Sequence, residues 1–267
     1  MPFVETKKPI KMEKLVSIIT PSFNSEKFIS ETIQSVLNQD YTNWEMIVVD
    51  DFSTDKTVAI VKELASKDNR IQLFELDKNS GTGIARNFGL SKSTGRYIAF
   101  LDADDLWKRN KLKIQIEFLI TNNQFFTFSF YDCMDENGNS LHKTVTAPKN
   151  LTYSQLFFSN FVGNLTGIYD SKYFGKIPIS TIRKRQDWMM WLTILKKIKT
   201  AKPVPESLAI YRIRKDSISA SKINLLKHNF VVYNQFHRFN KVVAAFCMIM
   251  FLIVQLFVKP CYVKKTN

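Results

Sequence analysis

Cysteine and glycine are both scarce in this chain of 267 residues, which has three cysteines and eight glycines. Cys133, Cys247 and Cys261 lie far apart and form no closely spaced pair of the kind that binds zinc. Their spacing excludes a disulfide framework and indicates a reducing compartment, for which the cytosol fits best. No internal repeat or low-complexity tract is present. The composition is that of a globular protein with one large domain, or one domain and a small appendage.

Acidic residues are also few, because 24 Asp and Glu stand against 38 Lys and Arg, which leaves a net charge of +14. Such a surplus suits nucleic acid, an anionic membrane surface or a phosphorylated substrate. The cations are scattered and no recognisable nucleic-acid module accompanies them, so no nucleic-acid partner is expected. Residues 1–14 are polar and lysine-rich without an apolar core, which excludes a secretory signal and predicts a flexible arm.

Residues 242–258 form the one long hydrophobic run, apolar on every helical face apart from Gln255. As a helix this segment would be about 25 Å long, slightly less than the ~30 Å hydrocarbon thickness of a bilayer. It is either a buried core helix or a membrane-attaching one, and the lack of a polar face favours membrane attachment. Whether it spans the bilayer or lies in its surface stays open, because cations flank it on both sides. These cations are Lys227, Arg238, Lys241, Lys259, Lys264 and Lys265.

Helix-like and strand-like segments alternate through the first half of the chain. This alternation predicts an α/β fold in which right-handed crossovers build a parallel sheet with helices on both faces. Ligand-binding loops should gather at the carboxyl edge of such a sheet, here at residues 21–25, 50–55, 79–86 and 102–107. We expect strands at residues 15–20, 45–49, 71–74 and 97–101, and helices at 26–38, 57–67 and directly after the loop at 79–83.

Beyond about residue 125 the pattern becomes irregular, and mixed architecture of this sort often builds the acceptor side of a transferase. An apolar run at 125–131 and a turn at 135–138 come first. We then expect helices at residues 153–159, 188–197 and 224–238, a strand at 207–212, and the apolar tail.

Three carboxylates, Asp102, Asp104 and Asp105, follow the buried strand expected at 97–101. This places them at the carboxyl edge of the sheet, where α/β proteins bind ligands. Two hard oxygen ligands at that position suit Mg²⁺ or Mn²⁺ carrying a phosphate. The alternative is an acidic turn that caps the helix starting near Arg109.

Two earlier strands end in loops of small polar or acidic residues. The sequence TPSFN at 20–24 can hold a flat base, or it can simply begin a helix with Ser25 as the cap. Asp51 follows the second strand and could accept hydrogen bonds from a base N–H. Its alternative is a helix start capped by Ser53 or Thr54.

The glycines of NSGTGIARNFG, residues 79–89, superficially suggest a dinucleotide fingerprint. The match fails, because the spacing is G-x-G-x-x-R and the segment follows the third strand rather than the first. A turn that places helix N–H groups and Arg86 beside a pyrophosphate suits the sequence better. The alternative is that Arg86 is a solvated helix residue.

Two charged segments lie in the second half. Asp187 stands at the start of an aromatic-rich helix in RKRQDWMMW, residues 183–191, and is either a catalytic base or an N-cap. The basic residues of YRIRKDSIS, residues 211–219, could face phosphates, or they form a solvated charge run.

The succession VSIITPSFN, IVVDDFSTDKT, NSGTGIARNFG, GRYIAFLDADDLW and RQDWMMWL resembles the family 2 glycosyltransferases, which have the GT-A fold. The resemblance runs from about residue 16 to about residue 219, and five motifs in the right order are far more specific than any one of them. It implies a nucleotide-sugar donor and inversion at the anomeric carbon.

The resemblance also implies roles for individual residues. Asp102 and Asp104 form the DxD motif, in which Asp104 ligates a divalent cation, Mn²⁺ or Mg²⁺, and Asp102 contacts the ribose or the metal shell. Asp187 matches the catalytic base. The donor-binding residues are Thr20, Pro21 and Phe23 around the nucleoside, Asp51 on the base, Arg86 near base and phosphates, Asp102, and Arg214.

Two departures from the family pattern concern residues near these motifs. Gln186 stands where many relatives have Glu, which leaves the base at Asp187 intact. Arg214 stands where many relatives have His, so a histidine contact to metal or phosphate is replaced by a guanidinium. A guanidinium cannot ligate a metal, although it binds phosphate directly.

The sequence therefore predicts an inverting glycosyltransferase that moves a sugar from a nucleoside diphosphate donor, with a UDP-sugar expected, to an acceptor hydroxyl. The expected product is lipopolysaccharide, capsule or a related bacterial surface glycan, made at the cytoplasmic face of the plasma membrane by a peripheral or single-span protein. The expected domains are an arm at 1–14, a GT-A domain at 15–220 with a donor half at 15–120 and an acceptor half at 121–220, and a helical extension at 221–267.

Two rival functions fit the sequence less well. A sugar-phosphate nucleotidylyltransferase should carry an N-terminal glycine-rich loop with arginine, and residues 16–25 contain none. A catalytically inactive, membrane-bound binding protein of a polysaccharide assembly complex would not need both Asp104 and Asp187.

Overall fold

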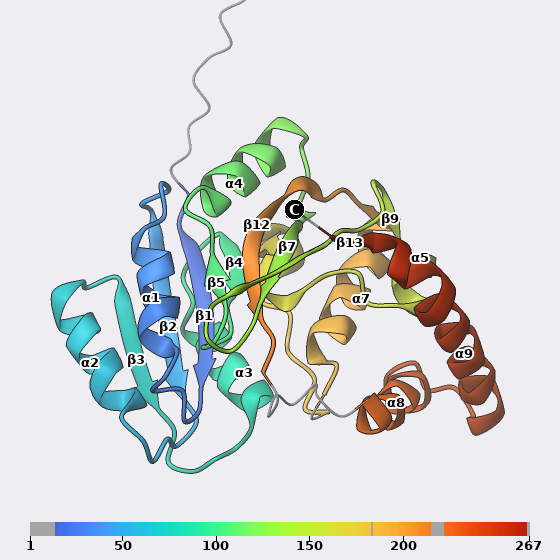
Figure 1. Ribbon diagram of the computed structural model, residues 1–267, viewed down its shortest axis with the longest axis horizontal. Coiled ribbons are helices and arrows are strands. Elements are labelled where there is room, and N and C mark those ends of the chain that lie inside the picture. The colour runs from blue at the N-terminus through green and yellow to red at the C-terminus, as the bar shows by residue number, and fades with distance from the viewer. Residues whose placement is uncertain (1–13, 183, 215–221, 266–267) are drawn as a thin grey trace, which may run out of the picture.

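A six-stranded sheet organises the first of two regions in the computed structural model, which describes residues 14–182, 184–214 and 222–265 (Figure 1). The strand order is β3-β2-β1-β4-β10-β6. The first four strands pair in parallel, which confirms the predicted parallel core. These strands are β1 (Val16–Ser22), β2 (Trp44–Asp50), β3 (Ile71–Glu75) and β4 (Tyr97–Phe100).

Two short strands from the second half complete this sheet. β10 (Ile168–Asp170) runs antiparallel to β4 and also to β6 (Phe126–Thr127). The alternation in the sequence did not predict them, because strands of two or three residues are too short to show a period of two. The sheet is therefore mixed, and it joins the two halves of the chain.

Helices cover both faces of the sheet, as predicted. Successive strand residues point to opposite faces, so Ile18 packs in one apolar cluster with Ile33 and Val61, while Ile19 packs in another with Leu90. The first cluster lies under α1 and α2, and the second lies beside α3 (Figure 1). The helices are α1 (Ile29–Leu37), α2 (Thr57–Lys67) and α3 (Thr82–Lys92).

The second region is built on a five-stranded sheet with the order β13-β8-β7-β12-β5. Its strands are β5 (Leu106–Trp107), β7 (Ser129–Met134), β8 (Ser140–Val145), β12 (Val204–Arg212) and β13 (Val263–Lys265). Around them lie α4 (Lys111–Thr121), β9 (Leu151–Thr152), α5 (Tyr153–Phe158), the 3₁₀ turn η1 (Asn164–Thr166), α6 (Ser171–Phe174), α7 (Gln186–Ile198) and β11 (Thr200–Ala201).

Strand β12 links the second region to the acidic loop that follows β4. It pairs antiparallel with β5, where Ala209 lies opposite Trp107 and Ile210 opposite Leu106. Because β5 directly follows the three predicted carboxylates, this pairing brings Arg212, at the end of β12, beside them.

The C-terminal segment is helical almost throughout and then returns to the body of the protein. α8 (Lys222–Val231) continues as η2 (Val232–Phe236), and α9 (Lys241–Ile253) continues as η3 (Val254–Val258) and η4 (Lys259–Tyr262). Strand β13 then pairs with β8. One side of α9 packs into the same apolar cluster as α7, so this extension shares a core with the second half of the chain.

Candidate active site

The acidic loop is held by a fully buried carboxylate. Asp105 is 1% exposed, and its carboxylate accepts a hydrogen bond from the backbone N–H of Arg212 at 3.0 Å. Burial, together with the negative charges of Asp104 and Asp102, raises the pKa of Asp105 well above its usual value. Asp105 is therefore a structural acid, and the loop does not cap the next helix, because α4 has Asn110 as its N-cap and no side-chain capping bond.

Asp104, the predicted metal ligand, is paired with Arg214. The Arg214 Nη1 atom lies 2.9 Å from Oδ2 of Asp104, and both side chains are about a quarter exposed, at 25% and 26%. Burial and the neighbouring Asp102 raise the pKa of Asp104, against the opposing charge of Arg214. The interpretation of Arg214 as a solvated charge is wrong, since its guanidinium also lies 5.0 Å from the ring of Phe28.

Arg212, at the end of β12, holds the acidic loop, a role that sequence reasoning did not assign to it. It is 3% exposed, and its Nε donates to the carbonyl of Asp104 at 2.9 Å. Its Nη1 donates to the carbonyl of Glu136 at 3.1 Å, and its Nη2 lies 2.6 Å from the carboxylate of Glu31. The signal that could have found it is its place as the last residue of a mostly apolar strand. Arg212 fixes the loop, and Arg214 is left to face the site.

Arg86 and Asp102 form the second pair of the donor site. The Arg86 Nη2 atom lies 2.5 Å from Oδ1 of Asp102, and Nη1 donates to Oε1 of Gln186 at 3.1 Å. Asn164 donates to both oxygens of Asp102 at 3.2 Å. Arg86 is 8% exposed, so its interpretation as a solvated helix residue is wrong. Its Nε is buried without a hydrogen-bond acceptor among the described residues.

The predicted nucleoside pocket lies at the ends of β1 and β2. Thr20 and Pro21 are buried in β1, and Oγ1 of Thr20 has no hydrogen-bond partner in the described parts of the chain. Phe23 follows on the loop and is 47% exposed. Asp51 accepts hydrogen bonds from the backbone N–H groups of Ser80 and Gly81, each at 2.7 Å. Asp51 thus ties the loop before α3 to the edge of the sheet.

The predicted helix caps near this pocket are wrong. α1 begins at Ile29 with Phe28 as its N-cap, and Ser25 contributes only its carbonyl, which accepts from the N–H groups of Phe28 and Ile29. α2 has Lys56 as its N-cap, so neither Ser53 nor Thr54 caps it. The first helix is consequently shorter than the expected 26–38.

Asp187 lies in the first turn of α7 and is not an N-cap. The cap position belongs to Arg185, which has a left-handed backbone with φ of 66° and makes no side-chain capping bond. The carboxylate of Asp187 accepts a hydrogen bond from Nδ2 of Asn160 at 2.8 Å. The alternative interpretation of Asp187 as a cap is therefore wrong, because its carboxylate is bonded by Asn160 and makes no capping bond.

The start of α7 also contacts the donor site, through Gln186. A Cβ atom added to Gly83 would lie 2.3 Å from Nε2 of Gln186, so glycine at this position of α3 makes room for the amide. Gln186 in turn accepts from Arg86, which pairs with Asp102. Two adjacent residues of α7 thus have different partners, because Gln186 contacts Arg86 and Asp187 contacts Asn160.

Two cations lie near Asp187, and sequence reasoning did not assign them to the site. Lys259 donates to the backbone carbonyl of Asn160. Burial and the charge of Arg185 lower the pKa of Lys259 to about 8, against the opposing effect of Asp187. Burial likewise lowers the pKa of Arg185, whose Nε donates to Oδ1 of Asn229 at 2.6 Å. The nearness of Lys259 depends on the return of the chain after α9, which no local pattern reveals.

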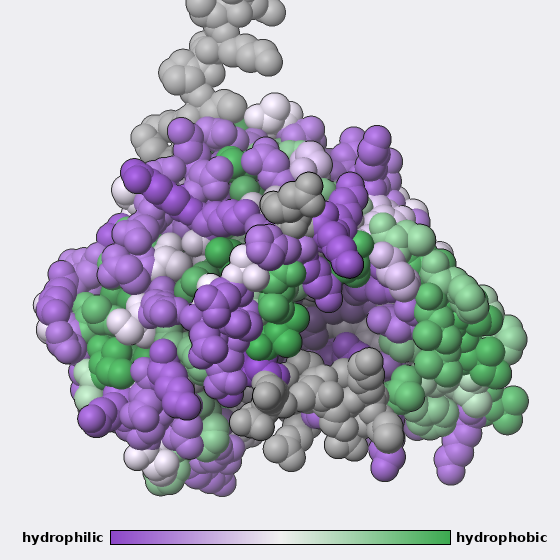
Figure 2. All heavy atoms as spheres, in the orientation of Figure 1, coloured by the Kyte–Doolittle hydropathy of each residue, from purple (hydrophilic) through white to green (hydrophobic). Residues whose placement is uncertain are grey.

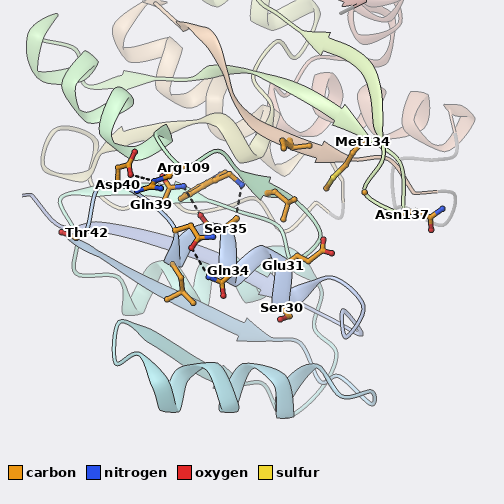
Figure 3. A pocket seen from close by; sticks show the side chains of 16 residues that line it. Ser30, Glu31, Gln34, Ser35, Gln39, Asp40, Thr42, Arg109, Met134 and Asn137 are labelled. Atoms are coloured by element: carbon orange, nitrogen blue, oxygen red, sulfur yellow. Dashed lines mark hydrogen bonds and ion pairs between the residues drawn. The ribbon is translucent and has the colours of Figure 1, made fainter. Parts of the chain in front are cut away.

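A wide hollow lies outside the predicted site residues. It has a volume of about 1270 Å³ and lies beside α1, where Glu31, Gln34, Asp40 and Arg109 line it (Figure 3). None of the residues predicted to bind donor, metal or acceptor contributes to its wall. Its size is therefore no reason to place the chemistry there, and the paired carboxylates mark the site instead.

An α/β sheet with a parallel core and arginine-paired carboxylates at its carboxyl edge is the arrangement expected of a GT-A glycosyltransferase. The Glycosyl transferase family 2 profile matches residues 17–175, and the chain belongs to this family. It is therefore an enzyme of the glycosyltransferase class, and the expected GT-A fold is confirmed.

Relatives and solved structures agree with this assignment. The chain is 41% identical over 237 residues to the putative teichuronic acid biosynthesis glycosyltransferase TuaG of Bacillus subtilis, covering 89% of this chain and 94% of that one. It is 39% identical over 223 residues to the glucosyltransferase WfgD of Escherichia coli, covering 83% and 86%.

Among solved structures, TarS 1–349 of S. aureus in complex with UDP-GlcNAc superposes with a TM-score of 0.69 at 20% identity, covering 91% of this chain and 73% of that one. The mannosyltransferase PcManGT of Pyrobaculum calidifontis, in complex with GDP-Man and Mn²⁺, superposes with a TM-score of 0.66 at 20% identity, covering 92% and 71%. These likenesses concern the fold. Of the two relatives by sequence, TuaG is named for teichuronic acid biosynthesis and WfgD for transfer of glucose to alpha-D-GlcNAc-diphosphoundecaprenol.

Proposed function

We propose that this protein is an inverting glycosyltransferase that transfers a sugar from a UDP-sugar to a hydroxyl of a lipid-linked glycan during synthesis of lipopolysaccharide, capsule or a related surface glycan. The observation that carries the proposal is the start of α7, where Gln186 contacts the donor-side arginine and Asp187 faces the acceptor side. The relative WfgD is named as a UDP-Glc:alpha-D-GlcNAc-diphosphoundecaprenol beta-1,3-glucosyltransferase, which supports this class of donor and acceptor.

The donor pocket holds two buried polar atoms that lack partners among the described residues. They are Oγ1 of Thr20 and Nε of Arg86. A buried polar group without a hydrogen bond costs roughly 1–3 kcal/mol, so a ligand that supplies acceptors and donors at both places would be favoured. In this proposal the nucleoside lies against Thr20, Pro21 and Phe23 with Asp51 on the base, and the diphosphate lies by Arg86.

The residues of the acidic loop fit a divalent cation. Asp104 and Asp102 supply carboxylate oxygens, which Mg²⁺ and Mn²⁺ prefer, and no cluster of three acidic, His or Cys ligands occurs in the described ranges. Such cations are commonly held by one or two carboxylates plus substrate phosphates. When bound, the cation supplies Lewis-acid neutralisation of the departing diphosphate. Arg214, now paired with Asp104, would then be free to bind a phosphate oxygen.

Asp187 acts as the general base in this proposal. Its carboxylate takes the proton of the acceptor hydroxyl while that oxygen attacks the anomeric carbon. The bond between that carbon and the donor diphosphate breaks on the opposite side, and the nucleoside diphosphate leaves with the bonding electron pair. Asn160 orients the carboxylate through its 2.8 Å hydrogen bond. Attack opposite the leaving group inverts the anomeric configuration.

The proposed place of work is the cytoplasmic face of the plasma membrane. The segment Lys241–Tyr262 is a helix long and apolar enough to cross a membrane by length and composition. Only 17% of its most apolar window is buried in the protein, which leaves most of that window open to contact with lipid. A lipid-linked acceptor and a water-soluble UDP-sugar meet at such a surface. Exposed apolar residues at one end of the molecule support attachment there (Figure 2).

The test of the proposed function is Asp187→Asn, which keeps the size of the side chain and the bond to Asn160. We expect transfer to fall by about 10²–10⁴, as is typical when a general base is lost. UDP binding with Mn²⁺ should stay within about twofold of the parent, because Asp187 contacts none of the donor residues. Transfer at the parent rate would assign the base to another residue, and it could not be Asp170, which is paired with Arg96. A parent protein that binds UDP-sugars but transfers to no acceptor would favour the inactive binding protein.

A further inference from the structure

The C-terminal helix has two apolar sides, and only one of them is covered. Ala244, Cys247 and Phe251 are buried against the cluster around Trp188 and Tyr233. The opposite side remains exposed along the whole length of α9 and η3, where side chains at spacings of three or four residues face solvent. These are Val242 (79% exposed), Phe246 (63%), Ile249 (57%), Ile253 (43%), Leu256 (66%) and Phe257 (74%). Figure 2 shows a continuous apolar surface at the end of the molecule where Figure 1 places α9.

The charged residues around this exposed surface indicate what covers it. The chain has no acidic residue after Asp216, whereas it has cations on both sides of the helix. Of these, Arg238 and Lys241 are exposed before the helix, and Lys264 and Lys265 after it. An apolar strip bordered by cations and free of anions is complementary to the headgroup region of an anionic bilayer.

The connections at both ends decide how the helix lies in that bilayer. After η4 the chain returns to the body: β13 pairs with β8, and the N–H of Thr146 donates to the carbonyl of Tyr262 at 2.7 Å. A helix that crossed the bilayer would place β13 on the side away from β8 and would expose Phe251 and its neighbours to lipid. The helix therefore lies in the plane of the membrane surface, with its covered side on the protein.

The end of this helix reaches the catalytic base. Lys259, the first residue of η4, donates to the carbonyl of Asn160, and the side chain of the same Asn160 donates to Asp187. Arg185 lies just before Asp187 in the chain, at the N-cap of α7. Neither Lys259 nor Arg185 makes an ion pair with a described residue, so two partly buried cations share one nearby carboxylate. Partly buried positive charge in excess favours the binding of an anion that neutralises it.

We propose that Lys259 and Arg185 form the binding site for the phosphate that joins a membrane-anchored acceptor to its lipid, and that the in-plane helix α9 positions this site at the bilayer surface. The inference rests on the proposed function, in which Asp187 is the base. It adds that the membrane anchor supplies one of the acceptor-binding residues. A sugar bound next to its phosphate would present a hydroxyl to Asp187 while the lipid chain stays in the membrane.

The in-plane placement can be tested with a thiol that the protein already has. Cys261 is exposed just after the helix, whereas Cys133 and Cys247 are buried. In sealed membrane vesicles with the cytoplasmic face outward, a membrane-impermeant maleimide should label Cys261 as completely as a cysteine placed on the catalytic body by Ser91→Cys, where the residue is exposed. Labelling of Cys261 only after the vesicles are opened would show a spanning helix and overturn the proposal.

The phosphate site is tested with Lys259→Gln and two acceptors that carry the same sugar. One acceptor is a polyprenyl diphosphate sugar, and the other is an uncharged alkyl glycoside. We expect KM for the diphosphate acceptor to rise about tenfold or more, which corresponds to about 1.4 kcal/mol. KM for the alkyl glycoside, kcat and UDP binding should change less than about twofold, because they do not involve the phosphate. Lys259→Arg should restore most of the lost affinity. Lys264→Gln, the matched control in β13, removes the same charge from an exposed position and should leave both acceptors unaffected.

The other outcomes separate this proposal from its rivals. An equal loss with both acceptors would mean that Lys259 only positions the base through Asn160, and an unchanged KM would mean that it binds no acceptor phosphate. Reduced flotation with vesicles rich in phosphatidylglycerol, with KM unchanged in detergent, would assign Lys259 to a lipid headgroup. Each of these results overturns the proposal while leaving the glycosyltransferase intact. A parent protein that transfers to neither acceptor would instead contradict the proposed function.

Discussion

The proposed donor and acceptor sides of this site differ in how their carboxylates are paired with cations. On the donor side each carboxylate of the acidic loop has an arginine beside it: Asp102 contacts Arg86, Asp104 contacts Arg214, and Asp105 accepts from the backbone of Arg212. On the proposed acceptor side a single carboxylate has two partly buried cations near it, and its hydrogen bond comes from the amide of Asn160.

The difference shows what each side still needs. The proposed donor side is balanced as it stands, so in the proposed function a cation and a diphosphate would exchange partners with the arginines. The proposed acceptor side has an excess of positive charge, which an anionic group on the acceptor would neutralise. The two sides thus differ in the substrate charge that each would accept.

The largest effect that would break this comparison is expected from Asp104→Asn. The change removes one charge from the acidic loop while keeping the shape, and Arg214 loses its ionic partner. We expect transfer to fall by about 10²–10³, the usual loss when a group that stabilises transition-state charge is removed. The stimulation of UDP binding by Mn²⁺ should be lost as well, as measured by calorimetry with and without EDTA. Equal UDP binding in EDTA by the parent protein would contradict the proposed metal.

An intermediate effect is expected from substitutions on the exposed side of α9. Phe246 and Leu256 are exposed, so changing both to Ser should leave the unfolding free energy within about 0.5 kcal/mol of the parent. Each exposed apolar side chain that enters a bilayer contributes roughly 1.5–3 kcal/mol, so binding to anionic vesicles should weaken at least tenfold. Phe251→Ser on the covered side is the matched control, and we expect it to destabilise the fold by about 3–5 kcal/mol. Unchanged vesicle binding by the double variant would exclude this surface from membrane contact.

The smallest effect concerns pH on the acceptor side. The pKa of Lys259 is lowered to about 8, and the groups near it are Arg185, which lowers it, and Asp187, which raises it. Protonated lysine binds phosphate, so kcat/KM for a diphosphate acceptor should fall as the pH rises through about 8, by up to about tenfold one pH unit above. Lys259→Arg should remove this fall, because arginine keeps its charge. A fall of the same size in the arginine variant would assign the titration to another group.

Much of the donor half could be predicted from the sequence, because its signals are local. The apolar runs at β1, β2 and β4 end in TPSFN, VVDD and LDADD, and the structure brings those ends to one edge of a parallel sheet. What the local signals could not show was the partner of each carboxylate. Arg212 and Arg214 lie more than a hundred residues from the acidic loop, and only the pairing of β12 with β5 brings them there.

The acceptor half was less predictable for the same physical reason. Asn160, Asp187 and Lys259 meet because three distant segments converge, and none of the three has a spacing that reveals the others. The helix caps predicted at Ser25 and Asp187 were wrong for a different reason. Residues that favour caps were present, but tertiary contacts moved the helix starts to Ile29 and Gln186.

The pairing of β12 with β5 has a consequence for the synthesis of the chain. The acidic loop is completed by Arg212 and Arg214, and the acceptor side by Lys259, so a chain emerging from the ribosome carries only an unfinished donor site until residue 214 is free. Contacts so distant in sequence form late. Ribosome-stalled chains ending at residue 200 should therefore lack cation-dependent UDP binding. Asp187 and Lys259 come together only once the apolar helix has been made, so under the proposed function the site would be complete only after the proposed membrane-binding helix.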